Sequence, residues 1–439
     1  MKLVYHNSST VTIVENDTRI LCDPWILDGE YYGSWFHYPK FVIDSTIYEC
    51  DAIYISHIHG DHLSENSLKR FNKKIPIYIN HYKSPFVKIK LKLLGFENII
   101  EVGHSQEVLI GDISLKIFSA DNCNPEVCGK FIGCSKVEED FEYTQIDSLA
   151  LFKSIKTNQT ILNLNDCPYD LASNVIKKHF CEKIIIDLLL VGYAGAGPYP
   201  QCFEFETEEL KLNAANRKKK KFIDQAVNYI DLVKPKFYMP YAGTYILGGK
   251  NHDLNKYRGV PTRNEGLDLI ESQIASDSQG FILKSNDEFD LNNLPDYNVY
   301  ENPDAYSSQL KSYKYFYESL QIPVFSEIEE LMNKAVIRYH SVRKKIKFNS
   351  EIPLIIDVLG SYFMIYNNKN KLKKIDLKIL QSLDKYVKIS MDSRLLKLCL
   401  MGPKYGHYDN AEIGSHIKYH RKPDTYNRAL YYCLNFLHV

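Results

Sequence analysis

The sequence predicts an α/β protein, in which two β-sheets lie between outer layers of helices, followed by a smaller mixed α+β part. Three observations predict this arrangement. Short apolar runs bounded by charged or turn residues, such as 51–57 and 75–80, indicate strands. Longer stretches between them, above all 206–233, carry apolar residues at helical spacing. Residues 286–304 are rich in Asn, Asp and Pro and indicate a linker.

The expected elements alternate along the chain in that pattern. The run 183–191 is apolar at most positions, which is typical of a strand buried on both faces. Strands are expected at 51–57, 75–80, 113–120, 148–154, 160–166, 183–191, 235–241 and 280–284, and helices at 64–71, 84–94 and 206–233. In the C-terminal part, helices are expected at 326–346, 374–386 and 393–400, with a strand pair around 353–366.

These elements divide the chain into an N-terminal domain of residues 1–285, a linker of residues 286–304 and a C-terminal α-rich domain of residues 305–439. A length of 439 residues agrees with two or three domains of ~150 residues each. The C-terminal domain carries no chemical motif. Its aromatic and basic segments at 404–409 and 419–427 could bind a ligand or join copies into a homo-oligomer.

The overall charge excludes several classes of partner. Lys+Arg and Asp+Glu both total 54, so there is no basic surplus for nucleic acid to bind. The first residues do not resemble a secretion signal, and the longest apolar stretches, such as 184–191, fall far short of the ~20 residues of a membrane span. The 10 cysteines form no dense framework, which favours reduced thiols. We therefore expect a cytoplasmic protein without a transmembrane segment.

Three imidazoles and one carboxylate follow the first of these strands, in the segment HIHGDH. Because side chains on extended backbone alternate, His57 and His59 point to the same side and suit one metal ion. A glycine then permits a turn, and Asp61 with His62 would hold a second ion about 3.5–4 Å away. Imidazole and carboxylate ligands suit zinc, iron or manganese. The alternative is a set of loop histidines that bind no metal.

The motif His-x-His-x-Asp-His after a strand resembles that of the metallo-β-lactamase superfamily. This resemblance implies a four-layer α/β/β/α sandwich with a catalytic role for residues 1–285. Segments 5–8 and 20–25 resemble the lactonase and N-acyl-phosphatidylethanolamine phospholipase D branch of the superfamily. CMP-N-acetylneuraminate hydroxylase is resembled by segments 33–37, 53–57, 161–167, 193–196, 240–243 and 423–426.

The resemblance also implies the remaining metal ligands. Asp166 follows the expected strand 160–166, where the superfamily places its bridging carboxylate. His252 would be the last histidine of the site, although an ordinary surface loop explains it equally well. His6 and Asp23 would orient the ligand imidazoles through hydrogen bonds.

One ligand position departs from the superfamily pattern. Asn124 stands where the hydroxylase has a histidine, and a neutral amide is a weak ligand for transition metals. Asp121 or Cys123 could substitute for it. Cys123, Cys128 and Cys134 could instead hold a structural zinc, with looser spacing than usual, or belong to a lid over the site.

A glycine-rich aromatic loop resembles the equivalent loop of the hydroxylase and suits a sugar. Tyr193 lies in this loop, and Tyr241 with Arg258 would complete the binding site for a sugar or nucleotide-sugar. Asp61 would have two roles, since it could orient a metal-bound hydroxide and then protonate the leaving group.

Three interpretations of the function remain open. The first is a hydrolase with two divalent ions, zinc or iron, that cleaves an amide, ester or phosphodiester of a sugar or nucleotide-sugar through a metal-bound hydroxide. The second is a di-iron oxygenase. No cysteine here has a histidine two or three residues after it, as Rieske ligands require, so oxygenation would need a separate electron donor. The third is a partly degenerate binding protein, which Asn124 favours.

Overall fold

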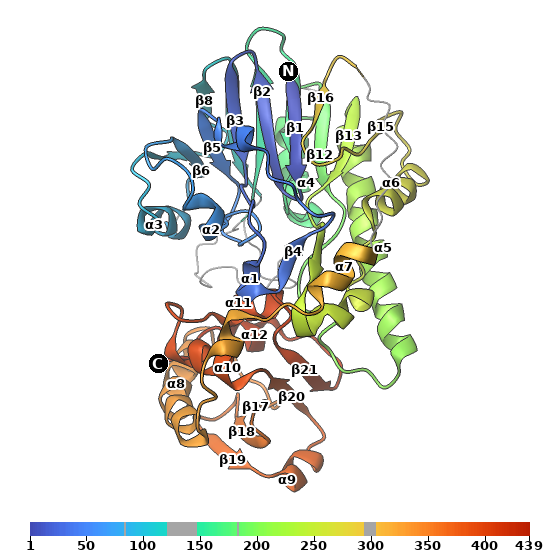
Figure 1. The fold of residues 1–439 in the computed structure, drawn as a ribbon. Coiled ribbons are helices and arrows are strands. Elements are labelled where there is room, and N and C mark those ends of the chain that lie inside the picture. Colours follow the sequence, from blue (N-terminus) through green and yellow to red (C-terminus); the bar gives the residue numbers. More distant parts are fainter. Residues whose placement is uncertain (83–84, 121–146, 182–183, 294–303) are drawn as a thin grey trace.

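Two seven-stranded sheets form the N-terminal part of the chain (Figure 1). The computed structural model describes residues 1–82, 85–120, 147–181, 184–293 and 304–439. The first sheet has the order β16 (Asp287–Asp290), β1 (Lys2–Asn7), β2 (Thr10–Glu15), β3 (Thr18–Cys22), β5 (Ala52–Ile55), β6 (Ile77–Asn80) and β7 (Ile99–Val102). The second has the order β15 (Gln279–Gly280), β13 (Phe237–Tyr241), β12 (Leu188–Gly192), β11 (Thr160–Asn163), β10 (Ser148–Ser154), β9 (Ile113–Ser119) and β8 (Glu107–Ile110).

The two sheets pack face to face around a shared apolar core. Ile13 and Ile20 from the first sheet belong to the same buried cluster as Leu115, Leu188 and Phe237 from the second. The strands β3, β5, β6 and β7 run parallel to one another, as do β11, β12 and β13. Parallel strands are typically covered on both faces, and the outer faces of both sheets carry helices.

Helices cover the outer face of each sheet. Ile53 and Ile55, whose side chains point away from the shared core, pack against Leu68 of α2 (Glu65–Leu68) and Leu91 of α3 (Phe86–Leu93). On the second sheet, Leu189 and other outward residues pack against α4 (Tyr169–His179), α5 (Glu208–Val233) and α6 (Arg263–Glu271). The predicted α/β/β/α sandwich is confirmed.

The longest of these helices, α5, is delimited by local interactions. It has 26 residues and begins after Thr207, whose side chain accepts a hydrogen bond from Leu210 N at 3.2 Å. It ends at Lys234, which adopts a left-handed conformation with φ 52°. Neither α5 nor any other helix in the described ranges combines the length and the apolar character that crossing a membrane requires.

The C-terminal part contains a five-stranded sheet beside a set of helices, so it is mixed α+β as expected. Its strands are β19 (Leu372–Ile375), β18 (Ser361–Ile365), β17 (Leu354–Val358), β20 (Tyr386–Ser390) and β21 (Lys418–Lys422), in that order. The helices beside it are α8 (Phe325–Lys345), α9 (Leu377–Gln381), α10 (Ser393–Met401), α11 (Tyr408–Ile413) and α12 (Arg428–Leu434), whereas α7 (Asp304–Leu310) lies against the N-terminal part (Figure 1). Ile356 and Ile389 of the sheet share one buried cluster with Met332, Leu396 and Leu430 of the helices.

Three predicted elements differ from the structure. Residues 286–304, expected as a linker, include β16, because Leu3 of β1 pairs with Phe289 and both side chains are buried. The helix expected at 374–386 is mostly absent: Asp376 caps the short helix α9, which lies between two strands. Of the strand expected at 280–284, only Gly280 lies in a strand, β15. The division into domains at these boundaries remains a prediction.

A short segment of the N-terminal part lies against the C-terminal part. It comprises α1 (Glu30–Gly33) and β4 (Trp35–His37), and β4 pairs with β14 (Tyr245–Leu247). Trp35 donates from Nε1 to Ile413 O at 3.2 Å, and His416 Nε2 lies 2.8 Å from Tyr31 O. Tyr32 OH lies 2.6 Å from His407 N. The two parts of the chain are therefore joined by hydrogen bonds to backbone atoms.

We expect Gly259→Ala to lower the free energy of unfolding by about 2–3 kcal/mol. Gly259 has φ +65°, and a Cβ atom there would lie 2.3 Å from the backbone oxygen of Ala215 in α5. Gly95→Ala is the matched control, because Gly95 has φ +88° with nothing within 4 Å of the added atom. Denaturant unfolding measures both variants. An equal loss in the two would show that the contact with α5 is unimportant.

Candidate metal centre

The segment after β5 turns back on itself and brings its polar side chains inward. His62 N and Leu63 N both donate to His59 O, at 3.0 and 2.7 Å. Ser64 then caps α2 by accepting a hydrogen bond from Ser67 N. His57 and His62 are fully buried, which is unusual for imidazoles unless they are paired or bind a ligand.

Among the residues that the structure describes, two groups of side chains could each hold a metal ion. The first comprises His57, His59 and Asp147, and the second comprises His57, His62 and Asp166. Within each group the ligand atoms all lie within 4.8 Å of one another. His57 Nε2 lies 2.9 Å from His59 Nδ1 and 3.6 Å from Asp147 Oδ1. Because the groups share His57, two ions bound here would be neighbours.

Asp23 fixes the orientation of His62. Its Oδ2 lies 2.7 Å from His62 Nδ1 and accepts a hydrogen bond from Ser56 Oγ at 2.6 Å, while its Oδ1 accepts one from Ser56 N at 2.7 Å. An imidazole that donates from Nδ1 presents the lone pair of Nε2. That Nε2 is buried without a hydrogen-bond partner in the described parts of the chain, and Asp166 Oδ1 lies 3.5 Å away.

Asp61 is held from the side by a tyrosine. Tyr31 donates from its hydroxyl to Asp61 Oδ1 at 2.5 Å and accepts a hydrogen bond from Gly60 N at 3.0 Å. The other oxygen, Oδ2, lies 3.6 Å from His62 Nε2. Tyr31 and Tyr32 have φ 50° and 61°, a left-handed conformation that costs such residues roughly 1–2 kcal/mol each. Strained backbone thus places the hydroxyl that orients Asp61.

The pKa values of the imidazoles diverge. Burial, and then the nearby His62 and His59, holds the pKa of His57 well below its usual value. Burial also lowers the pKa of His59. Burial opposes the charge on His62 as well, but the carboxylates, Asp166 first and Asp23 second, outweigh it and raise its pKa. Neutral His57 and His59 keep the lone pairs that a metal ion requires, and the carboxylates supply negative charge to balance it.

The donor set fits a dinuclear centre. Buried imidazole nitrogens, one without a hydrogen-bond partner, face carboxylate oxygens at distances too long for good hydrogen bonds. Cations commonly occupy such arrangements, and mixed imidazole and carboxylate ligands suit zinc, iron or manganese. His57, His59, Asp61, His62 and Asp166, all predicted from the sequence, lie together.

Asp147 is the residue that sequence reasoning missed. It directly precedes β10, which pairs antiparallel with β11, and Asp166 lies three residues beyond the end of β11. The start of one strand and the end of its antiparallel neighbour share one edge of a sheet. An acidic residue immediately before the predicted strand 148–154 was therefore a signal that could have been used.

The other predicted residues fall into three situations. Asn124, Asp121, Cys123, Cys128 and Cys134 lie outside the described residues. His252 belongs to neither ligand group, and its Nε2 contacts Ser307 Oγ at 2.8 Å. The ring nitrogens of His6 contact Thr12 and Asn286, not a ligand imidazole.

The three residues expected to bind substrate are all buried. Tyr193, Tyr241 and Arg258 expose 0%, 1% and 5% of their surface. Tyr241 donates its hydroxyl to Ser9 O, and Arg258 donates from NH1 to Tyr245 O. These contacts are enough to explain Tyr241 and Arg258 as structural residues. The role of all three residues in binding a sugar remains a prediction.

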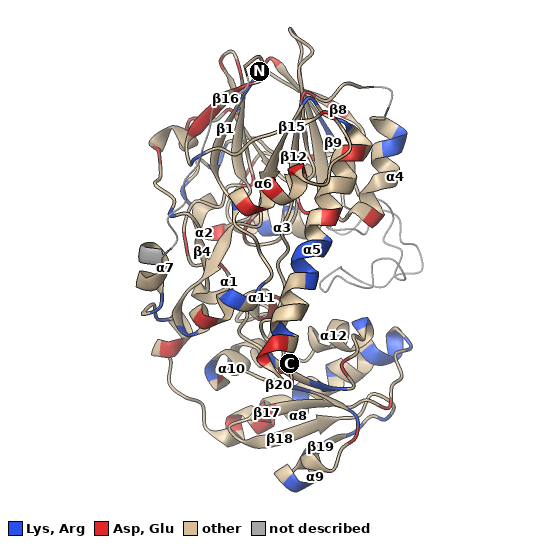
Figure 2. Cartoon of the chain, turned by 90° about the vertical axis from the view of Figure 1, so that its right-hand side faces the viewer, with Lys and Arg blue, Asp and Glu red and all other residues tan. Residues whose placement is uncertain are grey.

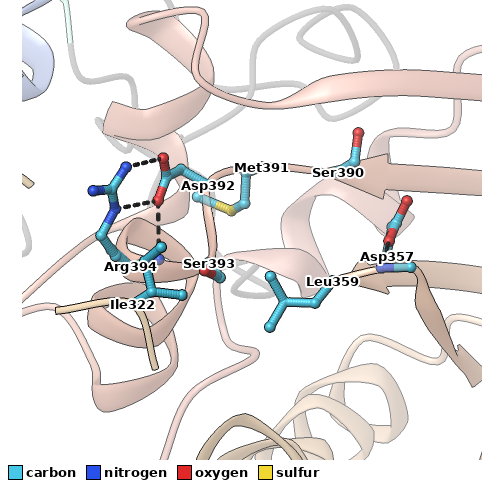
Figure 3. Close-up of a pocket in the computed structure, with 9 residues that line it drawn as sticks. Ile322, Asp357, Leu359, Ser390, Met391, Asp392, Ser393 and Arg394 are labelled. Atoms are coloured by element: carbon cyan, nitrogen blue, oxygen red, sulfur yellow. Dashed lines mark hydrogen bonds and ion pairs between the residues drawn. The ribbon is translucent and has the colours of Figure 1, made fainter. Parts of the chain in front are cut away.

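A cavity of about 340 Å³ lies elsewhere, at the carboxyl ends of the parallel strands β17 and β20 and the start of α10 (Figure 3). Asp392 on its rim is paired with Arg394 at 2.8 Å and with Lys250 at 3.0 Å. The charge at the start of α10 is thus already balanced. None of the residues predicted for the metal site lines this cavity.

Comparison with known families finds a match in the N-terminal part of the chain. The family model described as "Beta-lactamase superfamily domain" matches residues 2–130, which contain β5 and the histidine segment after it. Residues 2–130 are thus similar to this superfamily, and the superfamily resemblance predicted from the sequence is confirmed.

Two curated relatives extend the comparison. A "Putative Rieske 2Fe-2S iron-sulfur protein" of Mycolicibacterium smegmatis is 29% identical over 253 residues, which cover 55% of this chain and 43% of the relative. The "Inactive cytidine monophosphate-N-acetylneuraminic acid hydroxylase" of Homo sapiens is 26% identical over 283 residues, covering 61% of this chain and 50% of the relative. The predicted similarity to the hydroxylase is confirmed, and the matched region spans half of these relatives or less.

Among solved structures, an isothiocyanate hydrolase from Delia radicum gut bacteria is similar with a TM-score of 0.45 and 13% identity. The superposition covers 66% of this chain and 99% of the hydrolase.

Proposed function

We propose that this chain is a dinuclear metal-dependent hydrolase that cleaves an amide, ester or phosphodiester bond of a sugar or nucleotide-sugar derivative. The observation that carries the proposal is the pair of ligand groups that share His57. His57, His59 and Asp147 would hold one ion, and His62 and Asp166, which form the second group with His57, would hold the other beside Asp61. Metal ions in such a set supply Lewis acidity and activate water for attack on a carbonyl or phosphoryl centre.

The protein's own residues prepare this chemistry. The hydrogen bond from Tyr31 fixes Asp61 Oδ1, so that Oδ2 is the oxygen available to take up a proton and return it to the leaving group. Asp23 holds a proton on His62 Nδ1, so Nε2 is the nitrogen that would bind an ion, which would take the place of the proton there. Hydrolysis needs water as its only further reactant, which makes it the first candidate.

A sugar or nucleotide-sugar substrate is supported by the relatives. The human and mouse proteins that match this chain are named for hydroxylation of cytidine monophosphate-N-acetylneuraminic acid, the human one as inactive. Tyr193, directly after β12, and Tyr241, the last residue of β13, are buried, and they would shape such a site from behind its surface.

A di-iron oxygenase is the second candidate, because the ligand set also suits iron. Two imidazoles and one carboxylate, as in His57, His59 and Asp147, can hold non-haem iron as well as zinc. The names of the relatives, hydroxylase and Rieske protein, point in the same direction. Such a reaction requires two electrons from a separate donor.

Metal analysis of the full chain, purified without added metal, tests the proposal. We expect about two metal ions per chain. Zinc together with turnover of ester, amide or phosphodiester substrates would support the hydrolase. Iron together with an absorbance that changes on reduction would support the oxygenase. Absence of bound metal after reconstitution with either ion would overturn both and favour a binding protein.

A further inference from the structure

Lys218, on α5, carries a buried ammonium group without a partner. The residue as a whole is half-buried, but its Nζ is inaccessible to solvent and makes no hydrogen bond or ion pair with any described residue. Lysine nitrogens are rarely buried in this way, because removing an unpaired charge from water is costly. In Figure 2 the lysines and arginines of α5 are blue, and Lys218 belongs to its run 217–221.

Arg258 is a second buried cation nearby. Its guanidinium lies 3.9 Å from the centre of the Tyr245 ring, and NH1 donates to Tyr245 O and to Asn255 Oδ1. Its Nε has no hydrogen-bond partner, and no described carboxylate forms an ion pair with it. An arginine this deeply buried is normally paired with an acidic group.

The backbone brings the two cations to one place. A Cβ atom on Gly259, the residue after Arg258, would lie 2.3 Å from Ala215 O, so this turn packs directly on α5. A Cβ atom on Gly195 would lie 1.8 Å from the Phe222 ring of the same helix. Ala215, Lys218 and Phe222 follow at helical spacing and share one face. Lys218 therefore faces both the turn at Arg258 and the glycine-rich loop.

The electrostatic surroundings lack a compensating charge. Burial, and then the positive charge of Arg258, lowers the pKa of Lys218 to about 7. The thiol of Cys202 acts in the opposite direction, and no carboxylate of the described chain contributes. The side chains of Thr244 and Tyr245 add two buried hydroxyl groups without hydrogen-bond partners. An oxyanion is the ligand that buried cations and hydroxyl donors of this kind would bind.

Aromatic rings connect this cluster to the metal centre. The Tyr245 ring stacks on Trp35 with centroids 3.3 Å apart, and Trp35 contacts the Tyr31 ring at 4.7 Å. Tyr31 in turn donates to Asp61. The cation pair and the candidate metal ligands thus lie on either side of three packed rings, with Tyr245 stacked on Trp35 and Tyr31 edge-on to it.

We propose that Lys218 and Arg258, with the hydroxyls of Thr244 and Tyr245, bind the anionic group of the substrate, a phosphate or a carboxylate. This inference rests on the proposed function and narrows the substrate to an anionic sugar derivative. Arg258 was expected to contact substrate, whereas nothing in the sequence had indicated Lys218. The interaction is a set of charge-assisted hydrogen bonds and requires no covalent step.

Calorimetric titration of the full chain with inorganic phosphate, and separately with acetate, tests the site. A chelator is present throughout, so the result does not depend on metal chemistry and is distinguishable from failure of the proposed function. Lys218→Met should weaken the binding of the preferred anion by roughly ten- to a hundredfold, the value of a charge-assisted hydrogen bond. Lys218→Arg should retain it. Lys220→Met is the matched control, because Lys220 is exposed on the same helix and pairs with Asp224.

The thermal midpoint separates binding from folding. Because Lys218 Nζ has no partner, Lys218→Met should not lower the midpoint of the anion-free chain. Preference for phosphate over acetate would assign a phosphate-bearing substrate, and the reverse preference a carboxylate. Equal affinity of Lys218→Met and the unaltered chain, or no binding of either anion at millimolar concentration, would overturn the proposal.

Discussion

Replacement of His57 with alanine is expected to reduce bound metal from about two ions per chain to less than one, whereas replacement of His59 should leave about one. The reason is that His57 belongs to both ligand groups and His59 to only one. We expect the turnover number of His57→Ala to fall by at least about a hundredfold, the upper end of the loss seen when a residue behind a ligand is changed. Elemental analysis and steady-state kinetics measure the two effects.

The control for both variants is His81→Ala. The side chain of His81 is 65% exposed and contacts Glu101, away from the cluster. Because His57 is fully buried, circular dichroism and the thermal midpoint must confirm that the variant folds. Equal metal content in His57→Ala and His59→Ala would contradict a shared ligand, and unchanged content in both would place the metal elsewhere.

Asp23→Asn is expected to weaken metal affinity by roughly ten- to a hundredfold. The carboxylate of Asp23 accepts hydrogen bonds from Ser56 N, from Ser56 Oγ and from His62 Nδ1. The amide of asparagine has one oxygen in place of two, so it cannot accept all three. Asp23 has φ 46°, a conformation that asparagine tolerates, so the backbone should not change. Competition with a calibrated chelator at fixed pH measures the affinity.

Asp51→Asn serves as the comparison for that variant. Asp51 also accepts a backbone hydrogen bond, from Arg19 N at 2.8 Å, but lies at the surface. Its change should leave metal affinity within the error of the unaltered chain. If Asp23→Asn binds metal as tightly as Asp51→Asn does, then the orientation of His62 does not limit affinity.

The sandwich was predictable because its strands carry local signals. Ile53 and Ile55 pack against the outer helices, whereas Tyr54 faces the shared core, so nearly every position of β5 is apolar. The helix predicted at 374–386 shows the opposite case. Apolar residues there have helical spacing, but α9 is only five residues long, and Tyr386 begins β20. The end of the predicted helix is instead a strand, because Tyr386 and the residues after it pair with strands distant in the sequence. A local pattern of apolar residues does not indicate such pairing.

The metal centre was predictable only where its ligands are close in sequence. Four of them lie between His57 and His62, and the motif is dense enough to recognise. Asp147 joins them through the alignment of β10 with β11, which depends on register. Lys218 could not be found at all, since a lysine within a basic run on a helix normally faces water. Only the packing of α5 against Gly259 and Gly195, through Ala215 and Phe222, together with the burial of Nζ, reveals that its nitrogen is enclosed.

The contact between His416 and Tyr31 has a consequence for how this protein can change over time. Burial lowers the pKa of His416 to about 4, so the ring is neutral. Tyr317 OH lies 3.0 Å from His416 Nδ1, and His416 Nε2 can donate a hydrogen bond to Tyr31 O. The tyrosine that aligns Asp61 therefore depends on residues nearly 400 positions away. A descendant that exchanged or lost the C-terminal part would keep its sheets and histidines but inherit a misaligned carboxylate, so the two parts should be inherited together.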